Sequence, residues 1–314
     1  MGFAALNKRI IALVGPTGIG KTETAAALAK TLSAKVVVAD SMQVYQGMDV
    51  GTGKPDKALL REIAHYGIDL VPPTAEFSAA DYVRTVRPVM EKLLARDDFV
   101  VLTGGSGLYV RALLDGICEA PSANRFYREQ LLEEGQKTGW SAMHRRLQEV
   151  DPEAARRIHP HDKKRIIRAL EVFHDSGQPL TALQKKAAGF FENKAEISFF
   201  GLTCHRETLY QRIEERIDRW LASGWKEEAQ MLLQKGLSKT SAEALGYKEL
   251  YAYLKNETSW EETVRLIKRN SRHYAKRQIT WFHHDPRIRW IPVEDRSPRE
   301  LALVLAEDRI KNGK

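Results

Sequence analysis

Three short apolar runs stand out in the first hundred residues, namely Lys8–Val14, Val36–Asp40 and Phe99–Leu102. Each run is short for a helix and hardly alternates with polar residues, which is typical of a strand buried on both faces. Glu196–Leu202 is a fourth segment of this kind. We therefore predict that these four segments form strands of a sheet.

Helical patterns fill the intervals between the first strands. Thr22–Leu32 is rich in alanine, and Ser78–Ala95 begins with Ser78 and Asp81 at the spacing of a capping box. Strands that alternate with helices indicate an α/β fold with a parallel, doubly wound sheet, because parallel strands are joined by crossover helices.

The pattern changes after Pro121, where helices follow one another without a convincing strand. We predict a helical insertion over residues 122–197, within a core formed by residues 1–121 and 198–314. The expected helices are 124–134, 140–149 and Asp162–Asp175 in the insertion, and Thr208–Ser223 and Glu261–Phe282 in the core.

A glycine-rich loop joins the first expected strand to the first expected helix. It fits the pattern G-x-x-x-x-G-K-[ST] in the strand–helix context that a phosphate-binding loop (P-loop) requires. Glycines let backbone N–H groups turn toward an anion, and the helix N-terminus adds partial positive charge. Lys21 is expected to reach terminal phosphate oxygens, and the Thr22 hydroxyl to bind Mg²⁺. The predicted diphosphate or triphosphate site consists of Gly15, Pro16, Thr17, Gly18, Ile19, Gly20, Lys21 and Thr22.

Two further strand ends carry candidate chemistry, since ligands of a doubly wound sheet bind at the carboxyl ends of its strands. Asp40 ends VVVAD, and its carboxylate is compatible with a metal ligand, a general base, a ribose contact or a cap for the next element. Ser106 lies in the loop Gly104–Gly107, where the glycines allow either the close approach of a ligand or simply a tight turn.

Basic residues are concentrated in one segment of the 314-residue chain, whose formal net charge is +8. Residues 263–290 hold 8 basic residues and 1 acidic residue, Asp285. Arg265, Arg269, Arg272 and Lys276 share one face of the expected helix. We expect this stripe to meet a phosphate backbone rather than to form ion pairs, and a solvated face is the alternative.

A second arginine stripe lies on the expected helix Thr208–Ser223. Arg212, Arg216 and Arg219 share one face of it, with Trp220 on the opposite side. The stripe either binds phosphates or pairs with acidic neighbours on a solvated face. We expect Arg212 or Arg216 to reach the diphosphate.

Composition narrows the class of protein. Two cysteines exclude a disulfide framework and a cysteine-rich zinc module, and no apolar run approaches the roughly 18 residues of a membrane span. We therefore expect a cytoplasmic protein with no membrane partner. We also expect it to be monomeric, although composition does not bear on the oligomeric state.

Seven sequence blocks together resemble the tRNA dimethylallyltransferases, and they occur in that family's order. The blocks are Gly15–Thr22 (GPTGIGKT), Asp40–Tyr45 (DSMQVY), Gly47–Gly53 (GMDVGTG), Gly104–Tyr109 (GGSGLY), Asp162–Val172 (DKKRIIRALEV), Gly246-Tyr247-Lys248 and Ala275–Phe282 (AKRQITWF). The P-loop alone is generic, whereas the second block together with the last is highly specific.

The resemblance implies transfer of a dimethylallyl group from its diphosphate to the N6 amine of the adenine just 3′ of the anticodon in tRNA. The P-loop would then hold the leaving diphosphate, with Lys21, Thr22 and Mg²⁺ taking up charge. The resemblance gives Asp40 the role of general base. Ser106 falls where the family usually has a Thr that contacts the target nucleotide.

The resemblance also implies a set of contacts to the tRNA anticodon stem-loop. For the block at 162–172, packing of the insertion core is the alternative explanation. The implied contacts are Asp40, Ser41, Met42, Gln43, Ser106, Arg128, Lys164, Arg165, Ile166, Ile167, Arg168, Gly246, Tyr247, Lys248, Arg272, Lys276, Arg277 and Gln278.

Three rival functions share parts of this pattern. An ATP-dependent small-molecule kinase would also use the P-loop and Mg²⁺, but it does not account for the basic stripe. An AMP or ADP isopentenyltransferase shares the chemistry but has less need of that stripe. A non-catalytic P-loop protein that binds nucleic acid leaves Asp40 and Ser106 without roles.

Overall fold

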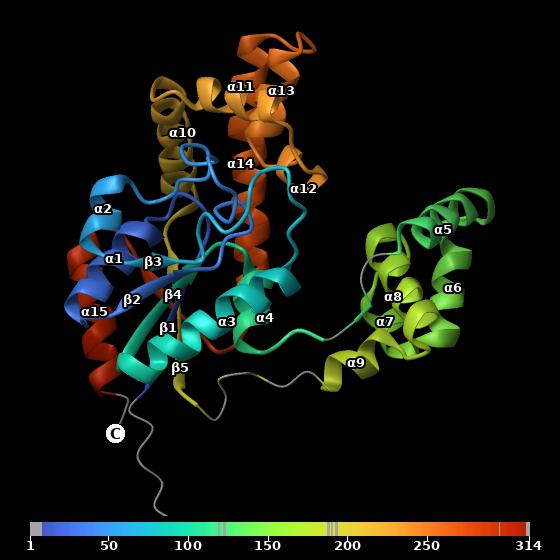
Figure 1. The fold of residues 1–314 in the computed structure, drawn as a ribbon, viewed down its shortest axis with the longest axis horizontal. Helices are drawn as coiled ribbons and strands as arrows, with labels where there is room; N and C mark the ends of the chain where they lie inside the picture. Colours follow the sequence, from blue (N-terminus) through green and yellow to red (C-terminus); the bar gives the residue numbers. More distant parts are fainter. Residues whose placement is uncertain are drawn as a thin grey trace, which may run out of the picture. The chain divides into compact units, whose positions relative to one another are not determined.

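The computed structural model describes residues 8–118, 120–121, 124–186, 189, 191, 194–294 and 296–311, and it divides into two compact units. Unit 1 comprises the described residues up to Leu114 and those after 190, and unit 2 comprises the described residues of 115–189. Both boundaries of unit 2 lie earlier than the expected 122 and 197, and strand β5 already begins at Glu196. Each unit has its own helices (Figure 1).

A six-stranded parallel sheet forms the centre of unit 1, which confirms the predicted α/β class. Its strand order is β3-β2-β4-β1-β5-β6. The strands are β1 (Arg9–Val14), β2 (Lys35–Val38), β3 (His65–Tyr66), β4 (Phe99–Gly104), β5 (Glu196–Thr203) and β6 (Ile288–Pro292). The four predicted strands are all present, whereas β3 and β6 are additions at the two edges.

Register places the carboxyl ends of the central strands side by side. Val14 of β1 lies opposite Gly104 of β4 and Gly201 of β5. β2 ends at Val38, so Asp40 lies just beyond the strand rather than in it. The P-loop, Asp40 and the glycine loop after β4 therefore meet at one edge of the sheet.

Helices cover both faces of this sheet. The helices are α1 (Lys21–Thr31), α2 (Lys57–Glu62), α3 (Ala79–Arg96), α4 (Gly107–Leu114), α10 (Arg206–Ala222), α11 (Trp225–Lys235), α12 (Lys239–Ala242), α13 (Tyr247–Leu254), α14 (Trp260–His283) and α15 (Pro298–Lys311). α1 packs against α15, and α3 packs against α4. Because the connections β1-α1-β2 and β2-α3-β4 run in opposite directions across the sheet, α1 and α3 lie on opposite faces.

Local signals explain where several helices begin. The Ser78 hydroxyl and the Asp81 carboxylate make the predicted capping box of α3, and each accepts the other's backbone N–H. α10, α11, α13 and α14 gather beyond the carboxyl edge of the sheet (Figure 1). Among the described residues, no helix combines the length and the apolar character that crossing a membrane would require.

Unit 2 is helical, as predicted. Its helices are α5 (Arg125–Thr138), α6 (Trp140–Val150), α7 (Pro152–Arg157), α8 (Lys163–Ser176) and α9 (Leu180–Lys186). Its core includes Leu131, Leu147, Ile166 and Leu170, which come from three of these helices. Gly177 ends α8 in a left-handed conformation, which explains the predicted stop at this residue.

Candidate active site

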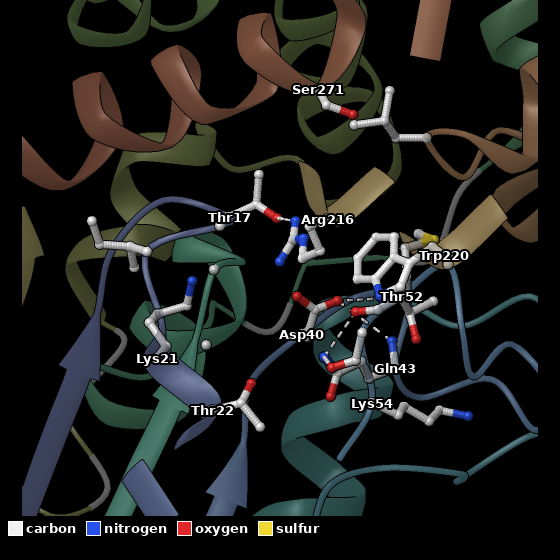
Figure 2. Close-up of a pocket in the computed structure, with 18 of the residues that line it drawn as sticks. Thr17, Lys21, Thr22, Asp40, Gln43, Thr52, Lys54, Arg216, Trp220 and Ser271 are labelled. Carbon is white, nitrogen blue, oxygen red and sulfur yellow. Dashed lines mark hydrogen bonds between the residues drawn. The ribbon is translucent and has the colours of Figure 1, made fainter. Parts of the chain in front are cut away.

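A cavity of about 1130 Å³ opens at the carboxyl edge of the sheet in unit 1. The P-loop forms one side of it, and the segment from Asp40 to Gln43 forms another. Helix α10 contributes Arg216 and Trp220 (Figure 2). It also contributes Arg212. Charged groups of both signs therefore face one enclosed space.

Glycines and two hydrogen bonds fix the conformation of the P-loop. Gly18 and Gly20 have φ angles of 83° and 96°, which a residue with a side chain rarely adopts. The Lys21 ammonium donates to the Pro16 carbonyl at 2.8 Å, and the Thr17 N–H donates to Oε1 of Gln278 at 2.8 Å. The Pro16 carbonyl and the Thr17 N–H are thus occupied by contacts that hold the loop, and Pro16 has no N–H of its own. The backbone N–H groups from Gly18 onward are available to bind an anion.

Two buried cations face this loop. Burial, together with the nearby Arg216 charge, lowers the pKa of Lys21 to about 8. Burial also lowers the pKa of the Arg216 guanidinium to about 10. Lys21 and Arg216 repel each other, and no described carboxylate forms an ion pair with either of them. A bound anion would offset this repulsion.

Arg216 is the arginine of its stripe that contacts the P-loop. Its guanidinium donates to the Thr17 hydroxyl and lies over the Trp220 ring, 4.3 Å from the centroid (Figure 2). Its buried Nε has no hydrogen-bond partner among the described residues. The expectation that Trp220 points to the opposite side is wrong, because its ring stacks on the guanidinium. Arg212 also lines the cavity.

Asp40 caps the turn that follows β2. Its Oδ1 accepts the N–H groups of Met42 at 2.9 Å and Gln43 at 3.4 Å. No described residue hydrogen-bonds Oδ2. The carboxylate lies across from Lys21 and Arg216, and its charge acts on the pKa of both (Figure 2). The capping role is therefore real, and one oxygen remains for a substrate.

Ser106 ties the end of β4 to the same turn. Its hydroxyl accepts the N–H of Ser41 at 2.9 Å and lies 3.2 Å from the Ser41 hydroxyl. The side chain is buried and is not among the described residues that line the cavity. Its visible contact is with Ser41, so direct contact with a nucleotide stays a prediction.

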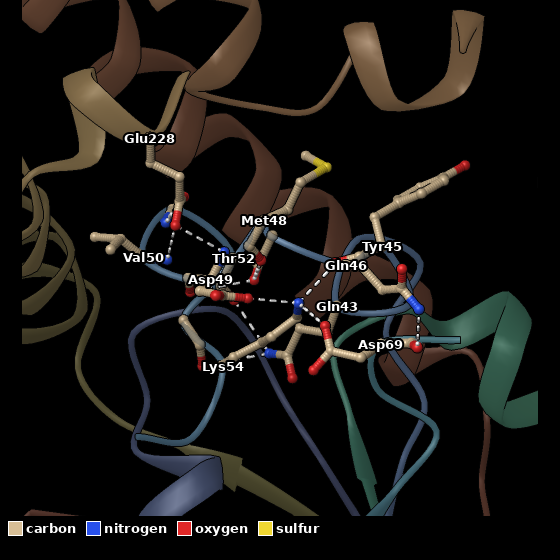
Figure 3. Close-up of polar contacts among 12 residues, drawn as sticks. Gln43, Tyr45, Gln46, Met48, Asp49, Val50, Thr52, Lys54, Asp69 and Glu228 are labelled. Atoms are coloured by element: carbon tan, nitrogen blue, oxygen red, sulfur yellow. Dashed lines mark hydrogen bonds and ion pairs between the residues drawn. The ribbon is translucent and has the colours of Figure 1, made fainter. Parts of the chain in front are cut away.

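A network of polar contacts fixes the segment 43–54 (Figure 3). The Lys54 side chain is 4% exposed, and its ammonium donates to the Tyr45 carbonyl at 2.6 Å, to Asp49 at 2.7 Å and to Asp69 at 2.5 Å. The three N–H bonds of an ammonium thus meet three oxygens. Gln43 donates to the carbonyl of Thr52 at 3.1 Å.

A buried carboxylate holds the other side of this segment. Glu228 accepts the N–H groups of Asp49 at 3.0 Å and Val50 at 2.9 Å, and it also accepts the hydroxyl of Tyr247. The burial of Tyr247 and the Glu228 charge raise the pKa of that phenol. The block Gly47–Gly53 is therefore anchored by helices α11 and α13.

Comparison with known proteins decides the family. The model of a family described as "IPP transferase" matches residues 43–285. A tRNA dimethylallyltransferase 2 of Geotalea uraniireducens is 43% identical over 285 residues, which are 90% of this chain and 92% of the relative. A tRNA dimethylallyltransferase of Geobacter sulfurreducens is 42% identical and covers 93% and 94%. The chain belongs to the IPP transferase family.

A solved structure agrees with this assignment to the IPP transferases. The tRNA isopentenylpyrophosphate transferase of Bacillus halodurans has 35% sequence identity and a TM-score of 0.70, and the match covers 98% of each chain. The similarity therefore extends through both units rather than the P-loop alone.

The Gly246-Tyr247-Lys248 block of this IPP transferase is largely structural. Gly246 has a φ of 85°, and a Cβ there would lie 2.2 Å from the Trp225 ring. Tyr247 is buried, but it is among the residues that line the cavity, so its contact with tRNA stays a prediction. Lys248 is exposed and pairs with Glu243 at 2.5 Å.

The basic stripe on α14 differs from the prediction. Arg272 pairs with Glu214, and Lys268 of the same helix pairs with Asp218 at 2.8 Å. Arg265 pairs with Glu262 at 2.6 Å. The expectation of a stripe without ion pairs is wrong, because α10 packs beside α14 and supplies Glu214 and Asp218, whereas Glu262 of α14 itself pairs with Arg265.

Free positive charge remains at the other end of α14. Lys276 and Arg277 are exposed, and neither has an ion pair among the described residues. The Arg277 guanidinium lies 5.6 Å from the centroid of the Tyr274 ring. Gln278 of the same helix is buried but lines the cavity, so its direct contact with tRNA stays a prediction.

Several expected contacts in unit 2 are also core residues. Ile166 and Ile167 are buried in the insertion core, which supports the packing alternative for these two. Arg128 and Arg168 both bind the buried Glu171, with nitrogen–oxygen distances of 2.7 and 2.6 Å. The guanidinium groups compensate a carboxylate that would otherwise be buried without a partner.

Exposed cations remain at the start of α8. Lys164 and Arg165 are exposed, and Arg165 lies 3.5 Å from Asp162. An exposed pair of this kind contributes little to stability. These two residues therefore stay candidates for contact with a polyanion.

The donor set at the P-loop suits a magnesium ion that is held mainly by phosphate. Among the described residues, there is no group of three or more His, Cys, Asp and Glu side chains that could hold a metal. Mg²⁺ is usually bound by one or two protein oxygens together with phosphates and water. Thr22 lines the cavity beside Lys21, so its hydroxyl can serve as such an oxygen.

Proposed function

We propose that this member of the IPP transferase family transfers a dimethylallyl group from dimethylallyl diphosphate to tRNA, at the N6 amine of the adenine just 3′ of the anticodon. One observation carries the proposal. Lys21 and Arg216 form a cationic side of the cavity, and the Asp40 carboxylate at the end of the neighbouring strand lies in the same cavity and acts on the pKa of both. The names of the curated relatives supply the substrate class.

The cationic side suits a leaving diphosphate. When the allylic C–O bond breaks, negative charge grows on the diphosphate oxygens. Lys21, Arg216 and the amides from Gly18 onward are already fixed around that position, so little reorganisation accompanies the step. A magnesium ion bound through the Thr22 hydroxyl and the phosphates would neutralise part of the same charge.

Asp40 suits the acceptor. The adenine N6 amine is a weak nucleophile because its lone pair is delocalised into the ring. As the N–C bond forms and the C–O bond breaks, the amine must lose one proton, which Oδ2 of Asp40 can accept. Oδ1 stays bound to the turn, so the carboxylate keeps its orientation.

Each unit carries exposed cations that suit contact with tRNA phosphates. The expected phosphate contacts that are exposed and form no ion pair with a buried carboxylate are Lys276 and Arg277 in unit 1, and Lys164 and Arg165 in unit 2. A loop base is already partly unstacked, so its extrusion into a cavity costs less than from a duplex. We propose a cytoplasmic enzyme that acts as a monomer.

The test is a panel of acceptors. The protein is incubated with Mg²⁺ and radiolabelled dimethylallyl diphosphate, with either unmodified tRNA or AMP in parallel. We expect label in tRNA and not in AMP. Label in AMP alone would retain the chemistry and refute the tRNA substrate. Transfer to neither, together with turnover of ATP, would favour the kinase.

A further inference from the structure

Gln278 lies inside the block 275–282, yet it does not share the exposure of its neighbours. Its side chain is 5% exposed, whereas Lys276 and Arg277 are exposed. Both ends of its carboxamide are engaged. Oε1 accepts the Thr17 N–H at 2.8 Å, and Nε2 donates to the Gly105 carbonyl at 2.9 Å.

The first of these bonds fixes the leaving-group side of the cavity. Thr17 belongs to the P-loop, and its hydroxyl accepts the Arg216 guanidinium. The hydrogen bond from the Thr17 N–H to Gln278 therefore fixes the position of the P-loop and of Arg216, which donates to the Thr17 hydroxyl.

The second bond fixes the acceptor side. Gly105 precedes Ser106, whose hydroxyl holds the Ser41 N–H next to Asp40. A shift of the Gly105 carbonyl would move Ser106, and with it the turn that orients the Asp40 carboxylate. One amide thus connects the two halves of the cavity.

Close packing explains the glycines of this loop without a ligand. A Cβ on Gly105 would lie 2.3 Å from Nε2 of Gln278, and a Cβ on Gly107 would lie 2.1 Å from the Trp281 ring. Gln278 and Trp281 are three residues apart on α14, so they share one face of the helix. That face lies directly on the loop.

We propose that Gln278 is a positioning residue that sets the distance between the diphosphate site and Asp40. This inference rests on the proposed function. The role needs a hydrogen-bond acceptor for the Thr17 N–H and a donor to the Gly105 carbonyl at the end of one side chain. The carboxamide of glutamine supplies both at this length. Glutamate of the same length lacks the donor when ionised, and methionine has a similar size but supplies neither bond at comparable strength.

Two variants test the role. Gln278→Met loses both bonds, and we expect kcat to fall about 10²-fold, because a displacement of about 1 Å between reacting groups has this effect. Gln278→Glu regains a donor only when its carboxyl group is protonated. The ratio of its kcat to that of the wild type should therefore rise as the pH falls, which a general loss of packing would not produce.

Two controls separate positioning from tRNA contact. Lys276→Ala, on the same helix, should weaken tRNA binding and flatten its salt dependence, whereas Gln278→Met should change neither. Glu261→Gln, at the exposed start of α14, should leave all constants unchanged. A main effect of Gln278→Met on the dissociation constant for tRNA, or a salt slope altered as in Lys276→Ala, would overturn the proposal.

A binding measurement keeps this test separate from the proposed function. Titration calorimetry with dimethylallyl diphosphate requires no turnover, and we expect Gln278→Met to bind it about tenfold more weakly than the wild type. An unchanged affinity, or a pH-independent kcat ratio for Gln278→Glu, would refute positioning. If the wild type binds the diphosphate but modifies no tRNA, the proposed function fails, and the affinity of Gln278→Met still decides the P-loop half of the inference.

Discussion

At the scale of a single residue, Asp40 caps the turn after β2, and the proposed function adds the role of proton acceptor. A substitution can separate the two roles. Asn keeps an oxygen that can accept the N–H groups of Met42 and Gln43, but it cannot accept a proton. We expect Asp40→Asn to lower kcat by about 10²–10⁴-fold, the usual size of general-base assistance. Quench-flow kinetics measures the fall in the rate of the chemical step. The dissociation constants for tRNA and dimethylallyl diphosphate, measured by direct binding, should stay nearly unchanged.

Asp40→Ala is the matched comparison, since it removes both roles. It should lose catalysis to a similar extent and also lower the melting temperature, which Asp40→Asn should not. Unchanged turnover in Asp40→Asn would remove the proton-accepting role.

The pKa of Lys21 gives a prediction with a definite sign. In the free protein this pKa is about 8, and a bound diphosphate raises it because the anion favours the charged form. The affinity for dimethylallyl diphosphate should be constant from about pH 7, where the ligand is fully ionised, to about pH 8. Above that it should weaken, by at most about tenfold per pH unit for one proton, until the pKa of the complex is reached.

Calorimetry at a series of pH values measures this dependence, and Lys21→Met is the control. That variant should bind weakly at every pH and lose the step near pH 8. A wild-type affinity that stays constant up to pH 10 would show that Lys21 does not contact the diphosphate.

The segment 43–54 shows how an element without regular secondary structure is fixed. Lys54→Met would leave the Tyr45 carbonyl, Asp49 and Asp69 without their common donor. Asp49 and Asp69 are partly exposed and can regain water, so we expect a loss of about 2 kcal/mol in the free energy of unfolding. Urea denaturation measures it. Lys57→Met, at an exposed position on α2, should change it by less than about 0.5 kcal/mol.

The exposed cations of helix α14 predict how the affinity for tRNA depends on salt concentration. Lys276→Ala and Arg277→Ala should each reduce the slope of log affinity for tRNA against log salt concentration, by about 0.7–0.9 for each phosphate that the side chain neutralises. Arg272→Ala should leave the slope unchanged, because its charge is already paired with Glu214. Equal effects at all three positions would restore the continuous stripe that the sequence predicts.

The difference between the predicted and observed stripe has a physical reason. Spacing along one helix shows which residues share a face, but it does not show which helix packs against that face. The carboxylates Glu214 and Asp218 lie on α10, so their two ion pairs depend on tertiary packing, whereas the pair of Arg265 with Glu262 is local to α14. The same holds for Glu171, whose guanidinium partners come from α5 and α8.

At the scale of the whole molecule, the sequence is sufficient to predict the four inner strands of the sheet and the P-loop. β1, β2 and β4 are buried on both faces, so their apolar runs were visible in the sequence. β3 has only two residues, and β6 (IRWIP) is short and mixed in polarity, so neither edge strand had such a signal. The P-loop, Asp40 and Ser106 were predictable because strand ends meet at one edge. Lys54, Glu228 and the buried amide of Gln278 were not, because their roles depend on partners distant in the sequence.

The most direct test of the account is the chemical identity of the product. Two anticodon stem-loops are incubated with the protein, Mg²⁺ and dimethylallyl diphosphate, then digested to nucleosides for mass spectrometry. One carries adenine just 3′ of the anticodon, and in the other a purine without the N6 amine replaces it. We predict dimethylallyl adenosine from the first and no modified nucleoside from the second. Equal modification of both, or none of either by a protein that binds dimethylallyl diphosphate, would contradict the account.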